Sequence, residues 1–251
     1  MTDDLLIETR DHVLTIRWNA PDRLNSLTGE MLHAAAAAIE DAGGDVRCVL
    51  ITGSGRAFGA GAALGEDFDG AATLVGINRL VRAITSAPLP VVAGVNGLAA
   101  GASASLALSA DLVVARRSAY FLLAFVNIGL MPDGGATELV AASIGRARAM
   151  QMAMLGQRLP AADAADTGLI HSVVEDVDFD AEVAALVERL AAGPTLALGR
   201  MKAAINASTL PTLDETLDRE TEGQAVLFET HDATEGGRAF VEKRPAKFEG
   251  R

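Results

Sequence analysis

Apolar residues recur with two different spacings along the first half of this chain, and the spacing separates strands from helices. Consecutive or alternating apolar residues predict short strands. These strands cover Leu5–Glu8, His12–Trp18, Val46–Thr52, Val91–Val95, Asp111–Ala115 and Tyr120–Leu123. Apolar positions three and four apart predict helices over 29–42 and 71–85, and an Ala/Ser-rich helix that ends near Ser109. Thr28 is the expected N-cap of the first helix, whose core stripe is Met31, Leu32, Ala35 and Ile39.

The pattern changes at Asp133, after which only helical spacing is seen. Glycines and Pro211 separate the helices, which we expect over 134–142, 145–155, 160–167, 180–192, 194–207, 211–229 and 231–243. Strands alternating with helices, followed by helices alone, predict an α/β core with a C-terminal helical region. A chain of 251 residues is long enough for one such domain with a helical appendage.

Composition and charge narrow the class of protein. Half of the residues are hydrophobic and only 4% are aromatic, so a large core of small aliphatic residues can be buried. The net charge of −12 argues against nucleic-acid binding. An acidic N-terminus and the lack of 18 consecutive apolar residues predict a cytoplasmic protein without a membrane span. The one cysteine, Cys48, allows no internal disulfide and is expected as a buried strand thiol.

Two glycine-rich loops, each between a strand and a helix, are the strongest candidates for a binding site. The first is Ile51–Leu64 and the second is Val95–Leu106. Glycine at this density exposes backbone N–H groups and lets a ligand approach closely. The first loop has neither a complete dinucleotide fingerprint nor the Gly-Lys-Ser/Thr of a P-loop, and an ordinary connecting loop is the alternative. One N–H group from each loop could converge on one oxygen and form an oxyanion hole.

Three motifs together resemble the signature of the crotonase (enoyl-CoA hydratase/isomerase) family. The first loop reads G-S-G-R-A-F-G-A-G-A-A-L over 53–64, the second begins V-N-G-L-A-A-G over 95–101, and the third block is Gly129–Thr137. The segments Gly145–Ala149, Ala161–Ile170 and Asp232–Pro245 are similar to later blocks of the family, so the resemblance spans nearly the whole chain.

This resemblance implies an α/β fold with a crotonase-like ββα spiral core over 1–195 and a C-terminal helical trimerisation region over 196–251. It also implies an acyl-CoA thioester as the substrate and a homotrimer or a dimer of trimers as the assembly. No separate cofactor is expected, because coenzyme A is part of the substrate. The four histidines show no metal-ligand spacing, so no metal site is expected either.

By the same resemblance, the main-chain N–H groups of Ala62 and Ala102 form the oxyanion hole. The family usually has glycine at the second position, but a backbone donor tolerates alanine there. Lys243 and Lys247 are candidates for contact with the coenzyme A of a neighbouring subunit, and a surface role for Arg23 or either lysine is the alternative. Coenzyme A itself is expected to contact Arg23, Leu24, Phe58, Ala60, Ala62, Ala63 and Leu64.

The residues at the expected catalytic positions differ from those of the family's hydratases. Those enzymes use two glutamates, and the matching positions here are Ser105 and Phe125, which cannot exchange protons near neutral pH. Several isomerases of the family, and an aromatic-acyl-CoA dehalogenase, use an aspartate at the position of Asp133. We therefore expect Asp133 to shift a double bond in an enoyl-CoA as acid and base, with Phe125 raising its pKa by desolvation. The motif order is similar to isomerases of phenylacetate breakdown.

Other interpretations stay open from the sequence. Asp133 could be only an N-cap, or a nucleophile in a hydrolase-type reaction. An atypical hydratase could take its acids from Glu66, Asp67 or Glu138. A CoA-binding protein without catalysis would also lack both glutamates. A serine hydrolase is disfavoured, because the segment around Ser103 lacks the last glycine of G-x-S-x-G.

Overall fold

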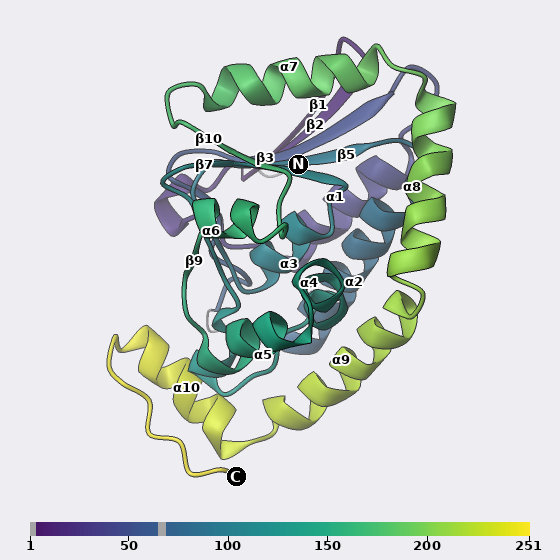
Figure 1. The fold of residues 1–251 in the computed structure, drawn as a ribbon. Helices are drawn as coiled ribbons and strands as arrows, with labels where there is room; N and C mark the ends of the chain where they lie inside the picture. Colours follow the sequence, from purple (N-terminus) through teal and green to yellow (C-terminus); the bar gives the residue numbers. More distant parts are fainter. Residues whose placement is uncertain (1–3, 65–68) are drawn as a thin grey trace.

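The computed structural model describes residues 4–64 and 69–251 and has a mixed α/β fold (Figure 1). Within those residues, the larger sheet has six strands in the order β1-β2-β3-β5-β7-β10. β1 is antiparallel to β2, and the other neighbouring strands are parallel. The strands are β1 (Leu5–Arg10), β2 (Val13–Trp18), β3 (Cys48–Gly53), β5 (Val91–Val95), β7 (Leu112–Arg116) and β10 (Ser172–Val174).

A second, smaller sheet continues three strands of the first. In the described residues its order is β4-β6-β8-β9, formed by β4 (Ala57–Gly59), β6 (Leu98–Ala100), β8 (Tyr120–Leu122) and β9 (Leu159–Pro160). β4, β6 and β8 are parallel and follow β3, β5 and β7 after a short turn. Helices α2 (Gly70–Ser86) and α3 (Ala102–Leu108) come after the first two strand pairs, so the repeated unit is strand, strand, helix. The predicted ββα core is therefore confirmed.

Helices cover both faces of the larger sheet. On one face α1 (Gly29–Glu40), α2 and α3 enclose the main core, in which Trp18, Phe58 and Phe121 are fully buried. On the other face α7 (Phe179–Ala191) lies along the strands (Figure 1), and its Val187 packs with Cys48. Cys48 is a buried strand thiol, as predicted, and burial raises its pKa to about 12.

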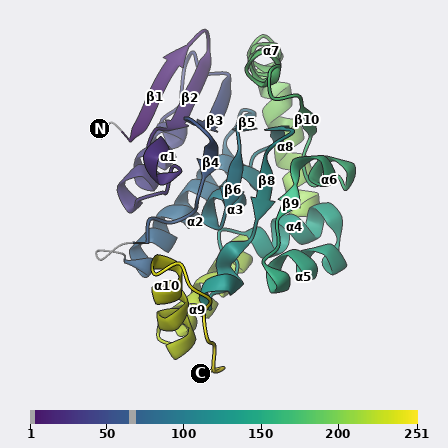
Figure 2. The same cartoon turned by 90° about the vertical axis from the view of Figure 1, so that its left-hand side faces the viewer.

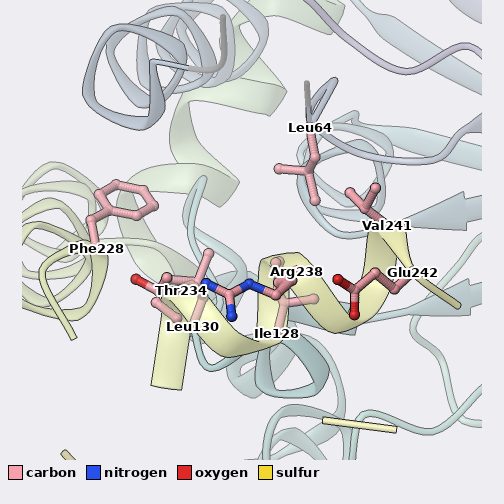
Figure 3. A pocket seen from close by; sticks show the side chains of 10 residues that line it. Leu64, Ile128, Leu130, Phe228, Thr234, Arg238, Val241 and Glu242 are labelled. Atoms are coloured by element: carbon pink, nitrogen blue, oxygen red, sulfur yellow. The ribbon is translucent and has the colours of Figure 1, made fainter. Parts of the chain in front are cut away.

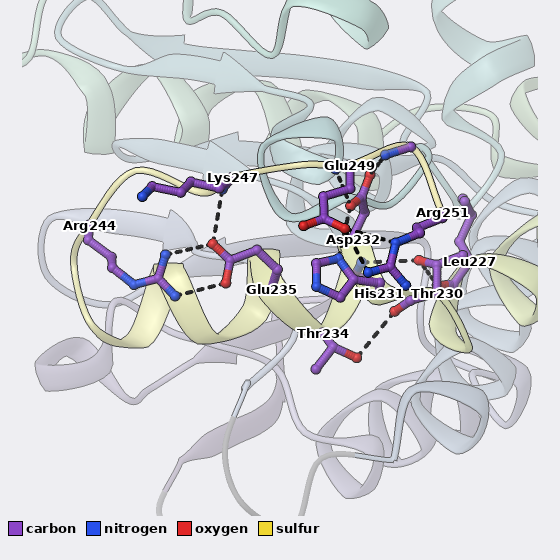
Figure 4. A network of polar contacts seen from close by, with 12 residues as sticks. Leu227, Thr230, His231, Asp232, Thr234, Glu235, Arg244, Lys247, Glu249 and Arg251 are labelled. Carbon is purple, nitrogen blue, oxygen red and sulfur yellow. Dashed lines mark hydrogen bonds and ion pairs between the residues drawn. The ribbon is translucent and has the colours of Figure 1, made fainter.

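The remaining helices surround this core and carry the chain to its C-terminus. Figures 1 and 2 show α8 and α9 running along the outside of the molecule to the end where α10 lies. On α10, the Glu235 carboxylate accepts hydrogen bonds from the Arg244 guanidinium at 2.6 and 2.8 Å and from the Lys247 N–H at 2.9 Å (Figure 4). These bonds hold the last residues against α10. The helices are α4 (Ala136–Ile144), α5 (Arg146–Leu155), α6 (Ala161–Asp166), α8 (Thr195–Thr209), α9 (Leu213–Phe228) and α10 (His231–Val241).

Each predicted helix is present, and one prediction about strands is wrong. Thr28 caps α1, because its hydroxyl accepts the Met31 N–H at 3.3 Å. After Asp133 we expected helices alone, but β9 and β10 lie in that part of the chain. They have two and three residues, and pairing with β8 and β7 rather than local pattern makes them strands. No helix of the described residues combines the length and the apolar character needed to span a bilayer.

Candidate active site

The carboxyl ends of β4, β6 and β8 lie at one edge of the smaller sheet, and the segments that follow them line a cavity of about 210 Å³. Parallel strands end at a common edge, so residues distant in sequence converge there. The lining is mainly apolar, with a few polar side chains. It comprises Ala60, Gly61, Ala62, Leu64, Gly70, Thr73, Leu74, Ile77, Gly101, Ala102, Leu122, Ala124, Phe125, Asn127, Ile128, Leu130, Asp133, Gln224, Phe228 and Phe240.

The first glycine-rich loop reaches the cavity at Gly61, whose φ of 93° favours glycine. Two hydrogen bonds hold this loop against the segment before α1. The Ala60 N–H donates to the Leu24 carbonyl at 2.9 Å, and the Leu27 N–H donates to the Gly61 carbonyl at 2.8 Å. Leu24 and the first loop, both expected to contact coenzyme A, therefore lie side by side.

The second loop approaches the first at Gly101, which also has a positive φ of 52°. A Cβ atom on Gly61 would lie 3.1 Å from the Ala100 carbonyl oxygen and 3.6 Å from the Ala102 nitrogen, so a side chain there would crowd the second loop. Ser103, fully buried in α3, ties the loops together, because its Oγ accepts the Gly61 N–H at 3.1 Å. The two loops are therefore joined to each other at the cavity.

Two main-chain donors face no acceptor within this unit. Ala62 and Ala102 both line the cavity, and each follows the glycine with positive φ in its loop. Ala102 is the first residue of α3, where an N–H group has no intrahelical partner. Across residues 4–64 and 69–251, no acceptor is found for the N–H group of either alanine. Within the described residues, both groups are therefore hydrogen-bond donors without an acceptor.

Asp133 also lines the cavity, in the turn between η2 (Ala124–Ile128) and α4. The residue is only 6% exposed, and its Oδ2 accepts a hydrogen bond from Gln224 Nε2 at 2.8 Å. Its Oδ1 is buried and has no partner among the described residues. The N-cap alternative is wrong, since α4 starts at Ala136 after Gly135 and has no side-chain cap.

The environment of Asp133 favours its neutral form. Burial raises its pKa to about 7, the Gln224 hydrogen bond opposes this rise, and the charge of Glu220 adds to it. The expected direction of the pKa shift is confirmed, and the buried Phe125 ring lines the same cavity. A carboxyl group with a pKa near 7 is populated in both forms at neutral pH, so it can accept and donate a proton.

The two positions that correspond to hydratase glutamates have other roles here. Ser105 is fully buried in α3, and its Oγ donates to the main-chain carbonyl of Asp133 at 2.7 Å. Phe125 gives the cavity part of its apolar surface. Neither side chain presents an acid, and among the described lining residues Asp133 is the single carboxyl group.

The alternative acids do not line this cavity in the described residues. The Glu138 carboxylate accepts hydrogen bonds from the hydroxyl groups of Thr212 at 3.1 Å and Thr216 at 2.6 Å, which join α4 to α9. Glu66 and Asp67 lie outside the described residues. In the part of the chain that the structure describes, no three His, Cys, Asp or Glu side chains gather to hold a metal ion.

The candidates for coenzyme A binding in the first loop differ in their placement. Ala60 and Leu64 line the cavity, as Ala62 does. Ala63 is half-buried beside it, and its N–H donates to the Leu27 carbonyl at 2.9 Å. Phe58 is fully buried in the core and does not line the cavity.

The basic candidates lie at the surface, away from the cavity lining. Arg23 ends η1 (Pro21–Arg23) and forms an ion pair with Asp4 at 2.8 Å. Lys243 and Lys247 are exposed in the segment after α10. None of the three lines the cavity that holds Asp133.

A second cavity, of about 550 Å³, adjoins the first beneath α10. The two share Leu64, Ile128, Leu130 and Phe228 as lining residues. Figure 3 shows these side chains together with Thr234, Arg238 and Glu242, which bring a hydroxyl group and two opposite charges to a lining that is otherwise apolar.

Sequence reasoning missed two polar residues of the site, Gln224 and Glu220. Both lie on α9, and they are 0% and 1% exposed. A signal was present in the predicted helix 211–229. Leu213, Leu217 and Phe228 mark an apolar stripe at helical spacing, and positions 220 and 224 fall within that stripe. Polar residues on a core-facing stripe indicate a buried polar contact.

Fold and site together define an α/β protein. Among its described residues, the cavity lining includes two main-chain donors without an acceptor and one carboxyl group with a pKa near neutrality. Comparison with known proteins identifies the family of this chain. Residues 8–251 match the family model described as enoyl-CoA hydratase/isomerase. The chain belongs to this family, within the crotonase superfamily.

Individual relatives carry the names of both reactions. The 1,2-epoxyphenylacetyl-CoA isomerase of Escherichia coli strain K12 is 41% identical over 262 residues, which cover all of both chains. The trans-2-decenoyl-[acyl-carrier-protein] isomerase of Streptococcus mutans is 34% identical over 259 residues, or 99% of this chain and 98% of the relative. A crystal structure of an enoyl-CoA hydratase from Mycobacterium avium subsp. paratuberculosis K-10 has 47% identity, a TM-score of 0.93 and 98% coverage of each chain.

Proposed function

We propose that this protein binds an enoyl-CoA thioester, stabilises its enolate and moves its double bond, with Asp133 as acid and base. One observation carries the proposal. Among the described residues that line the cavity, Asp133 is the single carboxyl group, and two free amides lie in the same cavity. One carboxyl group suffices to carry a proton from one carbon to another, whereas the hydratases of the family use two.

In the proposed reaction, Asp133 takes a proton from the γ-carbon of an α,β-unsaturated thioester. The electron pair of that C–H bond forms the new double bond between the β- and γ-carbons. The pair of the old double bond moves between the α-carbon and the carbonyl carbon, and the π pair of the carbonyl moves onto the thioester oxygen. The N–H groups of Ala62 and Ala102 bind this oxygen. Asp133 then returns the proton to the α-carbon, and the carbonyl forms again. A positioned base contributes about 10²–10⁴-fold, and one oxyanion donor is worth about 10²–10³-fold.

The same proposal places the rest of the substrate. The acyl group lies in the apolar cavity, and coenzyme A follows Leu24 and the first loop, with Arg23 near a phosphate. Lys243 and Lys247 reach the coenzyme A of a neighbouring subunit in a homotrimer or a dimer of trimers. The exposed apolar side chains of α9 and α10 support subunit contacts through 196–251, since Val226, Phe240 and Val241 are 69%, 62% and 68% exposed.

The substitution Asp133→Asn tests the proposal, because it keeps the shape of the side chain and removes its proton transfer. We expect turnover of a set of enoyl-CoA substrates to fall about 10²–10⁴-fold. The dissociation constant of an unreactive acyl-CoA should stay close to the wild-type value. Ultraviolet absorbance of the double bond measures turnover, and calorimetry measures binding. Wild-type turnover in Asp133→Asn would show that another group moves the proton.

An enoyl-CoA hydratase is the second candidate, and the names of relatives such as the mycobacterial hydratase favour it. Water addition to crotonyl-CoA by the wild-type protein, at a rate similar to that of double-bond migration, would support the hydratase. Tight binding of acyl-CoA without turnover of any substrate would instead support a CoA-binding protein without catalysis.

A further inference from the structure

Helix α9 presents a buried polar face to the turn that carries Asp133. Gln224 and Glu220 are one helical turn apart on this face, and both are almost completely buried. They come from the predicted C-terminal helical region, and Gln224 is 91 residues from Asp133 in sequence. A buried amide and a buried carboxylate are costly unless they are bonded, so their contacts require an explanation.

Both hydrogens of the Gln224 amide are in use. Nε2 donates to the Met131 carbonyl at 2.9 Å and to Asp133 Oδ2 at 2.8 Å. The first bond fixes the amide against the main chain just before Asp133. The second requires a lone pair on Oδ2, because an N–H group can only donate. A proton on the carboxyl group is therefore favoured on Oδ1.

The two oxygens of Asp133 are thus unequal. Oδ2 is held by Gln224, whereas Oδ1 is buried and has no partner among the described residues. Gln224 Oε1 is likewise buried without a described partner. Both unpartnered atoms are acceptors, so a proton on Oδ1 would supply a donor that this pair of side chains lacks.

Glu220 holds the main chain on the other side of Asp133. Its carboxylate accepts the N–H groups of Gly135 at 2.6 Å and Thr137 at 3.0 Å, and the Thr137 hydroxyl at 2.6 Å. Gln224 and Glu220 therefore fix the turn before and after Asp133 from one helix. Among the described residues, Glu220 is the one charged group that shifts the pKa of Asp133, and Ser105 from α3 donates to its main-chain carbonyl.

We propose that Gln224 is a positioning residue, which reserves Oδ2 of Asp133 as an acceptor and leaves Oδ1 as the oxygen that carries the transferred proton. This inference rests on the proposed role of Asp133 as acid and base. Under this inference, α9 supports proton transfer through Gln224 in addition to its structural role. A carboxyl group with one oxygen that makes no hydrogen bond presents its proton in one direction, which suits a transfer between two carbons of one bound substrate.

The substitution Gln224→Met tests the inference, because methionine has a similar length and no N–H group. Losing the donor destabilises the charged carboxylate, so the pKa of Asp133 should rise by about one unit. The rising limb of the profile of kcat/KM against pH should move upward by the same amount. At pH 7 the ionised fraction of Asp133 and with it kcat should fall about fivefold, with KM little changed. Gln224→Glu keeps a polar side chain at this position, unlike Gln224→Met, and also removes the amide N–H donor. It should move the rising limb of the pH profile in the same direction.

Thr221→Val is the matched control. Thr221 is on α9 between Glu220 and Gln224. Its hydroxyl accepts a hydrogen bond from Asn78 Nδ2 at 2.9 Å, whereas the hydrogen bond to the Asp133 carboxyl group comes from Gln224. This variant loosens α9 without touching the carboxyl group, so its pH profile should match the wild type. The inference is overturned if the rising limb of kcat/KM against pH lies at the same pH in both Gln224 variants as in the wild type.

A titration without substrate separates this inference from the proposed function. Carbon-13 NMR of aspartate-labelled protein gives the pKa of Asp133, whose resonance is the one lost in Asp133→Asn. If that resonance titrates higher in Gln224→Met, the control of Asp133 by Gln224 is established whatever the reaction. If Asp133→Asn is inactive and Gln224→Met titrates as the wild type, the inference is wrong and the proposed function stands. Full turnover in Asp133→Asn would instead defeat the proposed function and with it the catalytic role given to Gln224.

Discussion

The cavity holds two groups of polar atoms that the chain builds in different ways. The loop pair, residues 60–62 and 101–103, presents main-chain N–H groups whose places follow from the pairing of β4 with β6. The carboxyl cluster, formed by Asp133, Gln224 and Glu220, presents side chains from a turn and a distant helix. The first group depends on backbone conformation, and the second depends on the identity of three buried side chains.

This difference suggests separate roles for the loop pair and the carboxyl cluster. Most substitutions leave a main-chain donor in place, so the loop pair is a stable part of the fold that suits any ligand with an oxygen at that point. The carboxyl cluster changes with one substitution, because Ser105 and Phe125 cannot take over proton transfer. We infer that the loop pair determines which class of ligand is bound and the carboxyl cluster determines which reaction follows.

Within the loop pair, the largest expected effect comes from removing a main-chain donor with proline, the one residue that lacks an N–H group. Ala102→Pro places proline at the first position of α3, where it is tolerated because that N–H has no acceptor in the helix. Turnover should fall about 10²–10³-fold. Steady-state kinetics with an enoyl-CoA substrate measures the loss, and thermal unfolding should show that the fold is kept.

Arg146→Pro is the control for this substitution. Arg146 is the exposed first residue of α5, and it too follows a glycine with positive φ, Gly145. This variant should keep the wild-type turnover. Equal losses in both variants would mean that proline at a helix start, and not the missing donor, causes the effect.

The second prediction concerns the carboxyl cluster without any substrate. The pKa of Asp133 is about 7 in the folded protein and about 3.9 in an unfolded chain. The folded state therefore keeps a proton that the unfolded state releases between these values. The stability from this proton is present below about pH 4 and is lost as the pH rises to about 7.

Replacing Asp133 by Asn removes this pH dependence. Relative to Asp133→Asn, the wild type should lose roughly 2–3 kcal/mol of unfolding free energy between pH 5 and pH 8. Urea unfolding of both proteins at several pH values measures the difference. Asp163→Asn, at an exposed position of α6, should instead follow the wild type. Parallel curves for the wild type and Asp133→Asn would show that the carboxyl group is charged throughout this range.

The loop pair was easier to predict from the sequence than the carboxyl cluster, and the reason is physical. Glycine between an apolar strand and a helix is a local signal, and Ala62 and Ala102 do line the cavity as expected. The strands β4 and β6 were not predicted. Each has three residues, which are too few to show an apolar periodicity, and pairing with neighbouring strands makes them strands.

Gln224 and Glu220 could be recognised only as polar residues on the apolar stripe of a predicted helix. Their partner is a turn more than eighty residues earlier, and no local pattern specifies that α9 packs against it. Asp133 itself was predicted from its motif, and the direction of its pKa shift from the neighbouring Phe125. The hydrogen bond that holds one of its oxygens required the tertiary structure.

The smallest expected effect comes from substituting two serines of α3, one of which contacts the loop pair and the other the carboxyl cluster. Ser103 accepts the Gly61 N–H of the loop pair, and Ser105 donates to the main-chain carbonyl of Asp133. Both are fully buried, so either alanine substitution should cost about 1–2 kcal/mol of unfolding free energy. Equal stability losses make the two variants matched controls for each other.

Their effects on ligand binding should differ. Acetoacetyl-CoA forms an enolate that absorbs in the ultraviolet and mimics the charged oxygen. Ser103→Ala lets the first loop move relative to the second, so we expect about tenfold weaker binding of this enolate, which corresponds to about 1.4 kcal/mol. Ser105→Ala should keep the wild-type affinity, because the loop pair is intact. Equal weakening in both variants would mean that α3 couples the two groups, and the division between binding and reaction would have to be abandoned.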